Sequence, residues 1–272
     1  MIQPRSGSRG GMGRTITSTI LSVSPRLDEF KWFIEEREKI RKKKERGEDR
    51  PWTTDEILDK SRFTNIYRQH DKVSQFVFDK VGHLEGPLLV YNLLLSRLIN
   101  RVDVLSRFLP TIPTGNLSFL LEGDPAIMNA TAYQVAPGMV NLDEFSTNRE
   151  TIIHYPKKVY NEVYDVITST VDIKEAVEIG NKAFGGYIPF VMLQVVLDYH
   201  YLTGHYNDDS EIPVGQGAKV VVDALGGLDI LSYELGMQKY DVEHAACEYR
   251  KYLYRKDKQL NRYSYVPNSM GV

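Results

Sequence analysis

The sequence predicts a mainly α-helical protein. Apolar residues recur at spacings of three and four along most of its 272 residues, which is the pattern of helices that bury one face. Few segments alternate apolar and polar residues as half-buried strands do. Glycine and proline interrupt the helical pattern mainly between residues 110 and 155. We therefore expect helices throughout, with at most a small β element at residues 131–135 in that middle stretch.

The first helix is expected over residues 27–45. Its apolar residues include Phe30, Phe33, Ile34 and Ile40, and it ends in a basic run before Gly47. Glycine commonly stops a helix, and cations in the last turn suit the helix dipole. A basic run of this kind is typical of a solvated helix face, and it is also compatible with contact to phosphates.

Polar residues and glycines mark the starts of later helices. Thr53 or Thr54 is expected to cap a short helix at residues 55–59, whose first turn is acidic. Gly215 and Gly217 precede a helix at residues 218–225. The other helices are expected at residues 74–81, 88–100, 102–108, 159–168, 173–183, 188–202 and 240–254.

The chain is long enough for one large domain with its own core. We expect a single helical catalytic domain over residues 27–256. Residues 1–26 are rich in Gly, Ser and Arg near their start and are expected to form a flexible tail. Residues 257–272 are expected to form a C-terminal tail.

The composition excludes several classes of protein. One cysteine, Cys247, rules out an internal disulfide framework and a multi-cysteine zinc site, and it suits a reducing cytoplasm. No apolar run approaches the roughly 20 residues of a membrane span, so no membrane partner is expected. The formal charge of −2 does not by itself indicate a nucleic-acid binder, although a local basic patch remains compatible with it.

A first polar cluster contains Arg62, Asn65, Arg68 and Asp71. If this segment is helical, Asn65, Arg68 and either Asp71 or Lys72 lie near one face. Arginine suits phosphate or a base edge, asparagine can read a base, and aspartate can orient the arginines. On spacing alone, an exposed helix with intrahelical ion pairs is the simpler explanation.

A second feature is the turn formed by Gly215, Gln216 and Gly217, with Lys219 in the helix that follows. Two glycines let backbone N–H groups approach a DNA phosphate, as in the hairpin of helix-hairpin-helix modules. The short apolar helix that usually precedes such a hairpin is missing here. A plain glycine loop at a helix start is an equally good explanation.

A third cluster lies in the last expected helix. There Glu243 and Cys247 share one face, while His244 aligns with Glu248 and Lys251 on a neighbouring stripe. Carboxylates, an imidazole and a lysine within three turns can supply a general base, its orienting group and an anion partner. Ordinary surface salt bridges would explain much of the same pattern.

Two further polar residues, Gln194 and Asp198, interrupt an apolar helix. Buried polar groups need partners, so these side chains are expected to join the third cluster. Cys247 is better explained as a small core residue than as a nucleophile, because its neighbours are Ala246 and Tyr249.

Several of these motifs occur in the order of a known family. They are Pro51-Trp52-Thr53-x-Asp55, Arg62-Phe63-x-Asn65-x-Tyr67-Arg68-x-x-Asp71, Phe190-x-x-x-Gln194-x-x-x-Asp198, Gly215-x-Gly217-Ala218 and Glu243-His244-x-x-Cys247-Glu248-x-x-Lys251-Tyr252. Over residues 27–256 the chain resembles the α-glutamyl/putrescinyl thymine pyrophosphorylases. It is also similar to the helical domain of viral 5-hydroxymethyluracil DNA kinases, a relative of the same group.

The resemblance implies a bacteriophage enzyme with a helical fold related to helix-hairpin-helix DNA glycosylases. It implies transfer of an amine, from an amino acid or a polyamine, onto pyrophosphorylated 5-hydroxymethyluracil in DNA, with release of pyrophosphate. A separate kinase would supply that substrate, since this chain has no Gly-x-x-x-x-Gly-Lys-Ser/Thr phosphate loop. The host cytoplasm is the expected location.

On this reading the target base is flipped out of the duplex. The expected catalytic residues are Glu243, His244, Asp198 and Lys251. Substrate and pyrophosphate are expected to contact Arg62, Asn65, Arg68, Asp71, Gln194 and Glu248, and the DNA backbone is expected to contact Gly215, Gln216, Gly217 and Lys219. No protein-bound metal is expected, although Mg²⁺ can accompany pyrophosphate.

Two other functions fit the same residues. One is a non-catalytic DNA-binding helical module that partners a 5-hydroxymethyluracil DNA kinase, and the other is a glycosylase-like hydrolase that removes the base. The sequence alone leaves open the amine donor, the exact base, the strand preference, the oligomeric state and the metal requirement.

Overall fold

The computed structural model describes residues 24–122, 144–186 and 188–264. Within these ranges the chain forms twelve α-helices and two short 3-10 helices, and no strand. The mainly α prediction is therefore confirmed. Residues 131–135, where a small β element was expected, and most of the N-terminal segment 1–26 lie outside the described ranges. No helix within those ranges combines the length and apolar content that a bilayer span requires.

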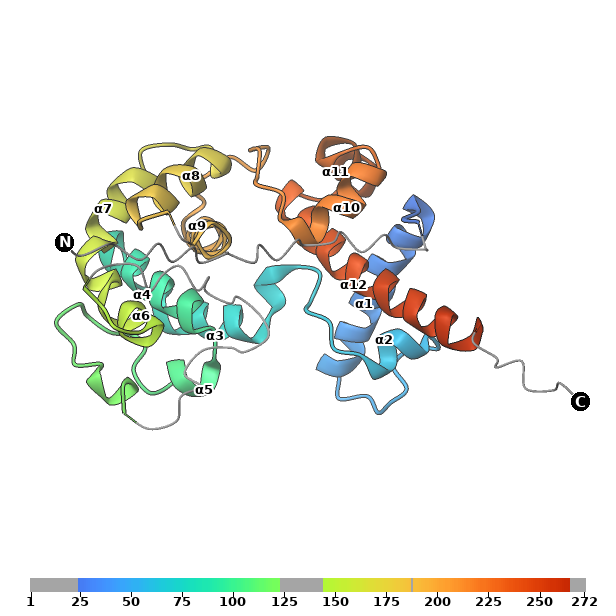
Figure 1. Ribbon diagram of the computed structural model, residues 1–272, viewed down its shortest axis with the longest axis horizontal. Coiled ribbons are helices and arrows are strands. Elements are labelled where there is room, and N and C mark those ends of the chain that lie inside the picture. The colour runs from blue at the N-terminus through green and yellow to red at the C-terminus, as the bar shows by residue number, and fades with distance from the viewer. Residues whose placement is uncertain (1–23, 123–143, 187, 265–272) are drawn as a thin grey trace, which may run out of the picture.

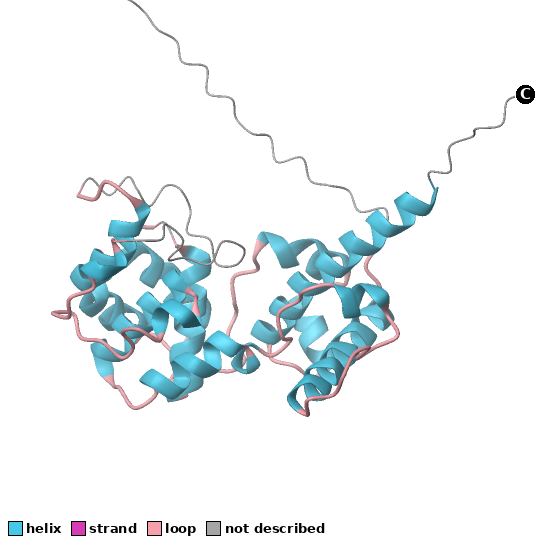
Figure 2. Cartoon of the chain, turned by 90° about the horizontal axis from the view of Figure 1, so that it is seen from below, coloured by secondary structure: helices cyan, strands magenta, loops and turns pink. Residues whose placement is uncertain are grey.

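The helices pack as two groups (Figures 1 and 2). In the first group, here called the α12 lobe, α1, α2, α10 and α11 pack on the long α12. In the second, the α4 lobe, α4 contacts α3, α5, α6, α7 and α9, and α8 lies against α7 and α9. The chain passes from the α12 lobe to the α4 lobe through residues 61–71 and returns through residues 204–215.

The bounds of the helices follow from the structure. The α12 lobe contains α1 (Leu27–Glu45), α2 (Glu56–Lys60), α10 (Gln216–Ala224), α11 (Leu228–Leu235) and α12 (Lys239–Ser264). The α4 lobe contains α3 (Lys72–Val81), α4 (Gly86–Ile99), α5 (Val102–Leu105), α6 (Asn148–His154), α7 (Pro156–Ile167), α8 (Ile173–Ala183) and α9 (Pro189–Thr203). The 3-10 helices are η1 (Arg68–His70) and η2 (Ser118–Leu120).

The start of α2 differs from the sequence expectation. Asp55, rather than Thr53 or Thr54, caps α2 by accepting a hydrogen bond from the Leu58 N–H at 2.8 Å. The Thr53 hydroxyl instead donates to Glu36 at 2.6 Å.

Two helices were not expected at all. The first, α6, starts with a capping box in which Thr147 and Glu150 satisfy each other's backbone N–H groups, a signal readable from the sequence. The second, α11, lies between Gly227 and Gly236, which both adopt positive φ. Gly227 lies just before α11 and Gly236 just after it, so α11 has only 8 residues and its periodic signal is short.

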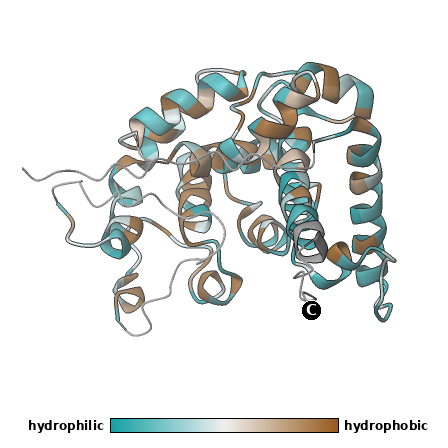
Figure 3. Cartoon of the chain, turned by 45° about the vertical axis from the view of Figure 1, so that its right-hand side comes forward, coloured by the Kyte–Doolittle hydropathy of each residue, from teal (hydrophilic) through white to brown (hydrophobic). Residues whose placement is uncertain are grey.

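The last helix continues past Asp257, where a tail was expected, to Ser264. Aromatic packing joins α12 to α1, because Tyr249 stacks on Phe30 at 5.0 Å and Tyr252 lies 5.5 Å from Phe33. Hydrophobic and hydrophilic residues alternate along most of the helices (Figure 3), as expected of helices that bury one face. In contrast, α4 and α9 are buried nearly all round in their middle turns.

A buried ion pair joins α4 and α9. Arg97 is 1% exposed and Asp198 is 0% exposed. The Arg97 guanidinium donates to both carboxylate oxygens of Asp198, with 2.6 Å between Nη2 and Oδ1, and it also donates to the Ser74 hydroxyl at 2.8 Å. This bidentate geometry satisfies two charges that would otherwise be costly to bury. Asp198 therefore has a structural partner inside the α4 lobe.

Replacing Asp198 with alanine is expected to lower the free energy of unfolding by about 3–5 kcal/mol, because Arg97 then stays buried without its carboxylate. The double variant Arg97→Met/Asp198→Leu removes both charges and is expected to be more stable than the single variant. Urea denaturation measures both changes. A loss below about 1 kcal/mol for Asp198→Ala would contradict a structural role for this pair.

Candidate functional site

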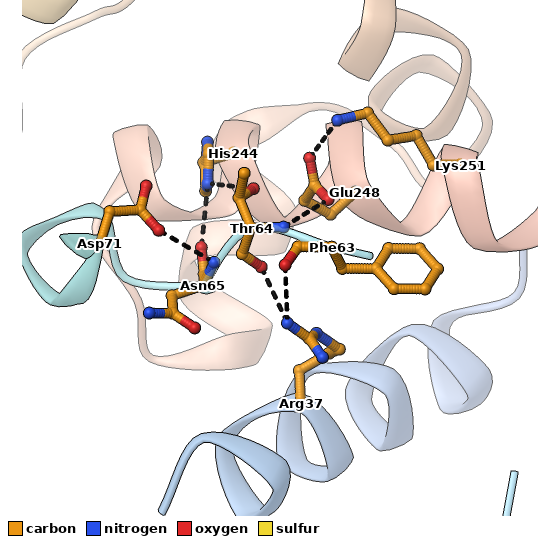
Figure 4. Close-up of polar contacts among 8 residues, drawn as sticks. All are labelled: Arg37, Phe63, Thr64, Asn65, Asp71, His244, Glu248 and Lys251. Carbon is orange, nitrogen blue, oxygen red and sulfur yellow. Dashed lines mark hydrogen bonds and ion pairs between the residues drawn. The ribbon is translucent and has the colours of Figure 1, made fainter. Parts of the chain in front are cut away.

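The segment that leaves the α12 lobe is held by side chains from two helices. Phe63, Thr64 and Asn65 run between α1 and α12 (Figure 4). Arg37 of α1, only 3% exposed, donates from Nη2 to the carbonyl oxygens of Phe63 at 3.2 Å and Thr64 at 3.1 Å. Its guanidinium carbon also lies 5.4 Å from the centre of the Phe63 ring. One arginine therefore satisfies two carbonyl groups of this segment.

On the other side, α12 supplies Glu248 and His244. The Oε2 atom of Glu248 accepts from the Thr64 N–H at 3.0 Å, and Oε1 pairs with Lys251. The His244 Nε2 atom lies 2.9 Å from the carbonyl oxygen of Asn65 and 3.1 Å from the Thr64 hydroxyl. A carbonyl oxygen only accepts, so Nε2 carries the hydrogen in this contact. Burial lowers the pKa of His244, which keeps the imidazole neutral near pH 7.

The first polar cluster is not a regular helix. The Asn65 N–H donates to Asp71 at 3.1 Å, and the Asn65 side chain donates to the carbonyl oxygen of His70 at 2.8 Å. Only the single turn of η1 is helical in residues 61–71. The condition for a shared helical face is therefore not met, because side chains rather than successive helical hydrogen bonds satisfy the backbone groups here.

The charge of Arg68 in η1 acts on the carboxyl group of Glu243 in α12. Arg68 is 2% exposed and Glu243 is 5% exposed. Burial raises the pKa of Glu243, while a hydrogen bond from the Gly215 N–H at 3.0 Å and the charge of Arg68 oppose that rise. Glu243 is thus a buried carboxyl group with a cation nearby, a combination that suits proton transfer.

Gly215, just before α10, and Gly217, in its first turn, allow that helix to approach α12 closely. A Cβ atom on Gly215 would lie 2.9 Å from Oε1 of Glu243, and one on Gly217 would lie 2.6 Å from Sγ of Cys247. Packing alone therefore explains both glycines. Gln216 and Lys219 are exposed at the start of α10, and Lys219 pairs with Asp223 at 2.9 Å.

The remaining expected residues lie elsewhere. Gln194 is 2% exposed within α9, and its Oε1 atom forms no hydrogen bond among the described residues. Asp198, one turn further along α9, is bound to Arg97 rather than to α12. Arg62 and Lys251 are exposed. The structure thus brings together Asn65, Arg68, Asp71, Glu243, His244, Glu248 and Lys251, with the α10 turn joined to them through Glu243.

A carboxyl group that the sequence analysis did not single out also lies at the junction. Asp241 is 9% exposed, and burial, with a smaller contribution from the charge of Glu38, raises its pKa to about 7. Burial, and after it the charge of Asp241, raise the pKa of Tyr201, whose ring packs on Tyr240 at 5.8 Å. In the sequence, Asp241 is a typical acidic residue of a first helical turn, which hides its burial. The sequence signal for its burial was its position between Tyr240 and Val242.

Comparison with known proteins assigns a family. A family model described as "5-hmdU DNA kinase, helical domain" matches residues 24–229, which is more than half of the chain. This match confirms the expected relation to 5-hydroxymethyluracil DNA kinases. No curated protein and no solved structure matches the chain. The matched range ends at the start of α11, so α12 lies beyond it. Within the described ranges, no group of three or more His, Cys, Asp or Glu side chains is placed to hold a metal ion.

Replacing Asp241 with asparagine is expected to change how stability depends on pH. The folded chain binds the Asp241 proton more tightly than the unfolded chain, so this contribution to stability is full below the ordinary carboxyl pKa and is lost as the pH rises through about 7. The neutral variant avoids that loss. The free energy of unfolding of the variant should therefore exceed that of the parent by a few kcal/mol at pH 8, at about 1.4 kcal/mol for each pKa unit. The two values should match near pH 3.5.

Chemical denaturation at a series of pH values measures this difference. Asp165→Asn, at an exposed position of α7, serves as the matched control and should leave the pH dependence unchanged. Parallel pH profiles for the parent and Asp241→Asn would show that Asp241 does not hold its proton in the folded state.

Proposed function

This chain belongs to the 5-hmdU DNA kinase helical-domain family, and from that premise we propose that it is a DNA base-hypermodification transferase. Its substrate is pyrophosphorylated 5-hydroxymethyluracil in DNA, and it transfers an amine from an amino acid or polyamine. The observation that carries the proposal is the buried Glu243, with its raised pKa, next to the charge of Arg68. A base and a cation are the two groups that this substitution needs.

The reaction exchanges one bond at carbon for another. The nitrogen lone pair of the amine attacks the methylene carbon on C5 of the uracil, and a C–N bond forms. The bond between that carbon and the pyrophosphate oxygen breaks, and pyrophosphate leaves with the electron pair. The attacking nitrogen then loses a proton. Catalysis therefore requires a proton acceptor at the amine and positive charge at the departing oxygen.

Glu243 is the proposed proton acceptor. A raised pKa makes its carboxylate a stronger base than an exposed glutamate. The Gly215 N–H binds Oε1 and fixes the orientation of the carboxylate, so Oε2 is proposed to take the proton. His244 is neutral and bonds the Asn65 carbonyl, which makes it a positioning residue for the segment that leads to Arg68.

Positive charge for the leaving group is assigned to Arg68, with Arg62 and Lys251 as exposed additions near the same segment. Asp71 and Glu248 orient that segment through the N–H groups of Asn65 and Thr64. Because of these contacts, Asp71 and Glu248 are proposed to be positioning residues.

Recognition of the substrate is assigned to separate groups. A base in a duplex must be turned out of the stack before its methylene can react, at a cost of a few kcal/mol. The Asn65 side chain is proposed to read the uracil edge. Gln194 is buried within α9 of the α4 lobe and is not assigned to this contact. The start of α10, with Gly215, Gln216, Gly217 and Lys219, is proposed to contact the DNA backbone. Asp198 supports the fold through Arg97.

A second function is favoured by specific contacts. His244, Glu248 and Asp71 all bind the main chain of residues 63–65, as side chains with a structural role do. The matching family model also carries the name of a kinase domain. Both observations fit a non-catalytic DNA-binding module that partners a 5-hydroxymethyluracil DNA kinase.

Analysis of nucleosides from treated DNA tests the proposal. DNA carrying pyrophosphorylated 5-hydroxymethyluracil is incubated with the protein and a mixture of amino acids and polyamines, then digested and analysed by mass spectrometry. The proposal predicts an aminated thymidine and free pyrophosphate. Glu243→Gln should slow transfer by about 10²–10⁴-fold, since it removes the base while its amide oxygen still accepts from Gly215.

Glu162→Gln is the matched control, because Glu162 is an exposed carboxylate of α7 on the other lobe. It should retain full activity. Full activity in Glu243→Gln would remove Glu243 from the mechanism. Unchanged nucleosides together with tight DNA binding would favour the non-catalytic module, and loss of the base would identify a glycosylase.

A further inference from the structure

A polar groove lies between α2 and the C-terminal half of α12, away from Glu243. Figure 1 shows these two elements side by side. The groove encloses about 270 Å³ and is open to solvent. Its lining contains three cations, two neutral polar residues, one aliphatic residue and one acid: Lys60, Arg255, Lys258, Ser61, Gln259, Ile57 and Glu56. We call it the α2–α12 groove.

The cations from α12 have no acidic partner among the described residues. Arg255 and Lys258 are three residues apart and therefore share one face of the helix. The guanidinium of Arg255 lies 5.0 Å from the centre of the Phe63 ring, and Nζ of Lys258 lies 4.6 Å from that of Tyr254. Ring contacts position these cations without neutralising them.

The single acid of the groove does not cancel this charge. Glu56 pairs with Lys60 at 2.9 Å, and their side chains are 66% and 70% exposed. Exposed pairs of this kind contribute little and are readily exchanged for another partner. The groove therefore has an excess of positive charge on a chain whose net charge is −2.

We propose that the α2–α12 groove binds the phosphodiester backbone of DNA. An open groove with cations along one side and hydroxyl and amide donors beside them suits a chain of phosphates. Ser61 in the groove lining lies two residues before Phe63, where the segment at the lobe junction begins. The inference rests on the proposed function for its choice of DNA as substrate.

Salt dependence of DNA binding tests the groove. The double variant Arg255→Ala/Lys258→Ala is compared with the parent by fluorescence anisotropy, using an unmodified 30-base-pair duplex between 50 and 200 mM salt. Each lost phosphate contact reduces the slope of log Kd against log salt by about 0.9. We expect the slope to fall by about two and the affinity at low salt to fall about tenfold or more.

Two further variants separate charge from folding. Lys174→Ala/Lys182→Ala removes two exposed lysines from α8 in the α4 lobe and should leave affinity and slope unchanged. Arg255→Lys in the parent background keeps the charge and should bind DNA nearly as well as the parent. If the groove variant and the α8 variant behave alike, the groove does not bind DNA. Binding of free inorganic phosphate without an effect on DNA would also overturn the proposal.

The outcome is independent of catalysis, because the duplex is unmodified. A lower affinity in the groove variant with no amine transfer by the parent would support the groove and refute the proposed transferase. Amine transfer by the parent with unchanged DNA binding in the groove variant would support the transferase and refute the groove. With saturating DNA, the groove variant should transfer the amine at the parental rate, since Glu243 is intact.

Discussion

The structure depends on side chains that hydrogen-bond the backbone of residues 63–65, because no helix or strand supplies those hydrogen bonds there. These residues carry the chain from one lobe to the other, and they lie between α1 and α12. Arg37 satisfies two of their carbonyl groups, while Glu248 and His244 satisfy an N–H and a third carbonyl. An unpaired backbone group buried here would cost about as much as a lost hydrogen bond. These three side chains therefore fix the path to Arg68.

Neighbouring positions of α12 consequently have different tasks. His244 and Glu248 face the connecting segment, whereas Glu243 faces the turn before α10 and accepts from Gly215. Glu243 combines burial, a raised pKa and the charge of Arg68 without supporting residues 63–65. Gly215 contributes by letting the start of α10 approach that carboxylate closely, and Gly217 does the same at Cys247. The site is thus a consequence of how α10 and η1 pack on α12.

Periodicity predicted the helices that carry long apolar faces, and α8 begins and ends at the predicted residues. It did not predict the conformation of residues 61–71, because partners about 180 residues away determine it. Burial of Asp241 was hidden for the same reason, since Glu38 and Tyr201 come from other helices. The approach of Glu243 to Gly215 and Arg68 likewise depends on packing between distant segments. The residue types of the site were readable from the sequence, whereas their partners were not.

The most direct test of the account is a structure of the protein bound to a duplex that carries one pyrophosphorylated 5-hydroxymethyluracil. This base is expected to be turned out of the stack into the lobe junction. Its methylene carbon should lie within reach of Glu243, and its pyrophosphate should contact Arg68. A base that stays stacked in the duplex, or one bound away from Glu243, would contradict the assignment of this junction as the reaction site.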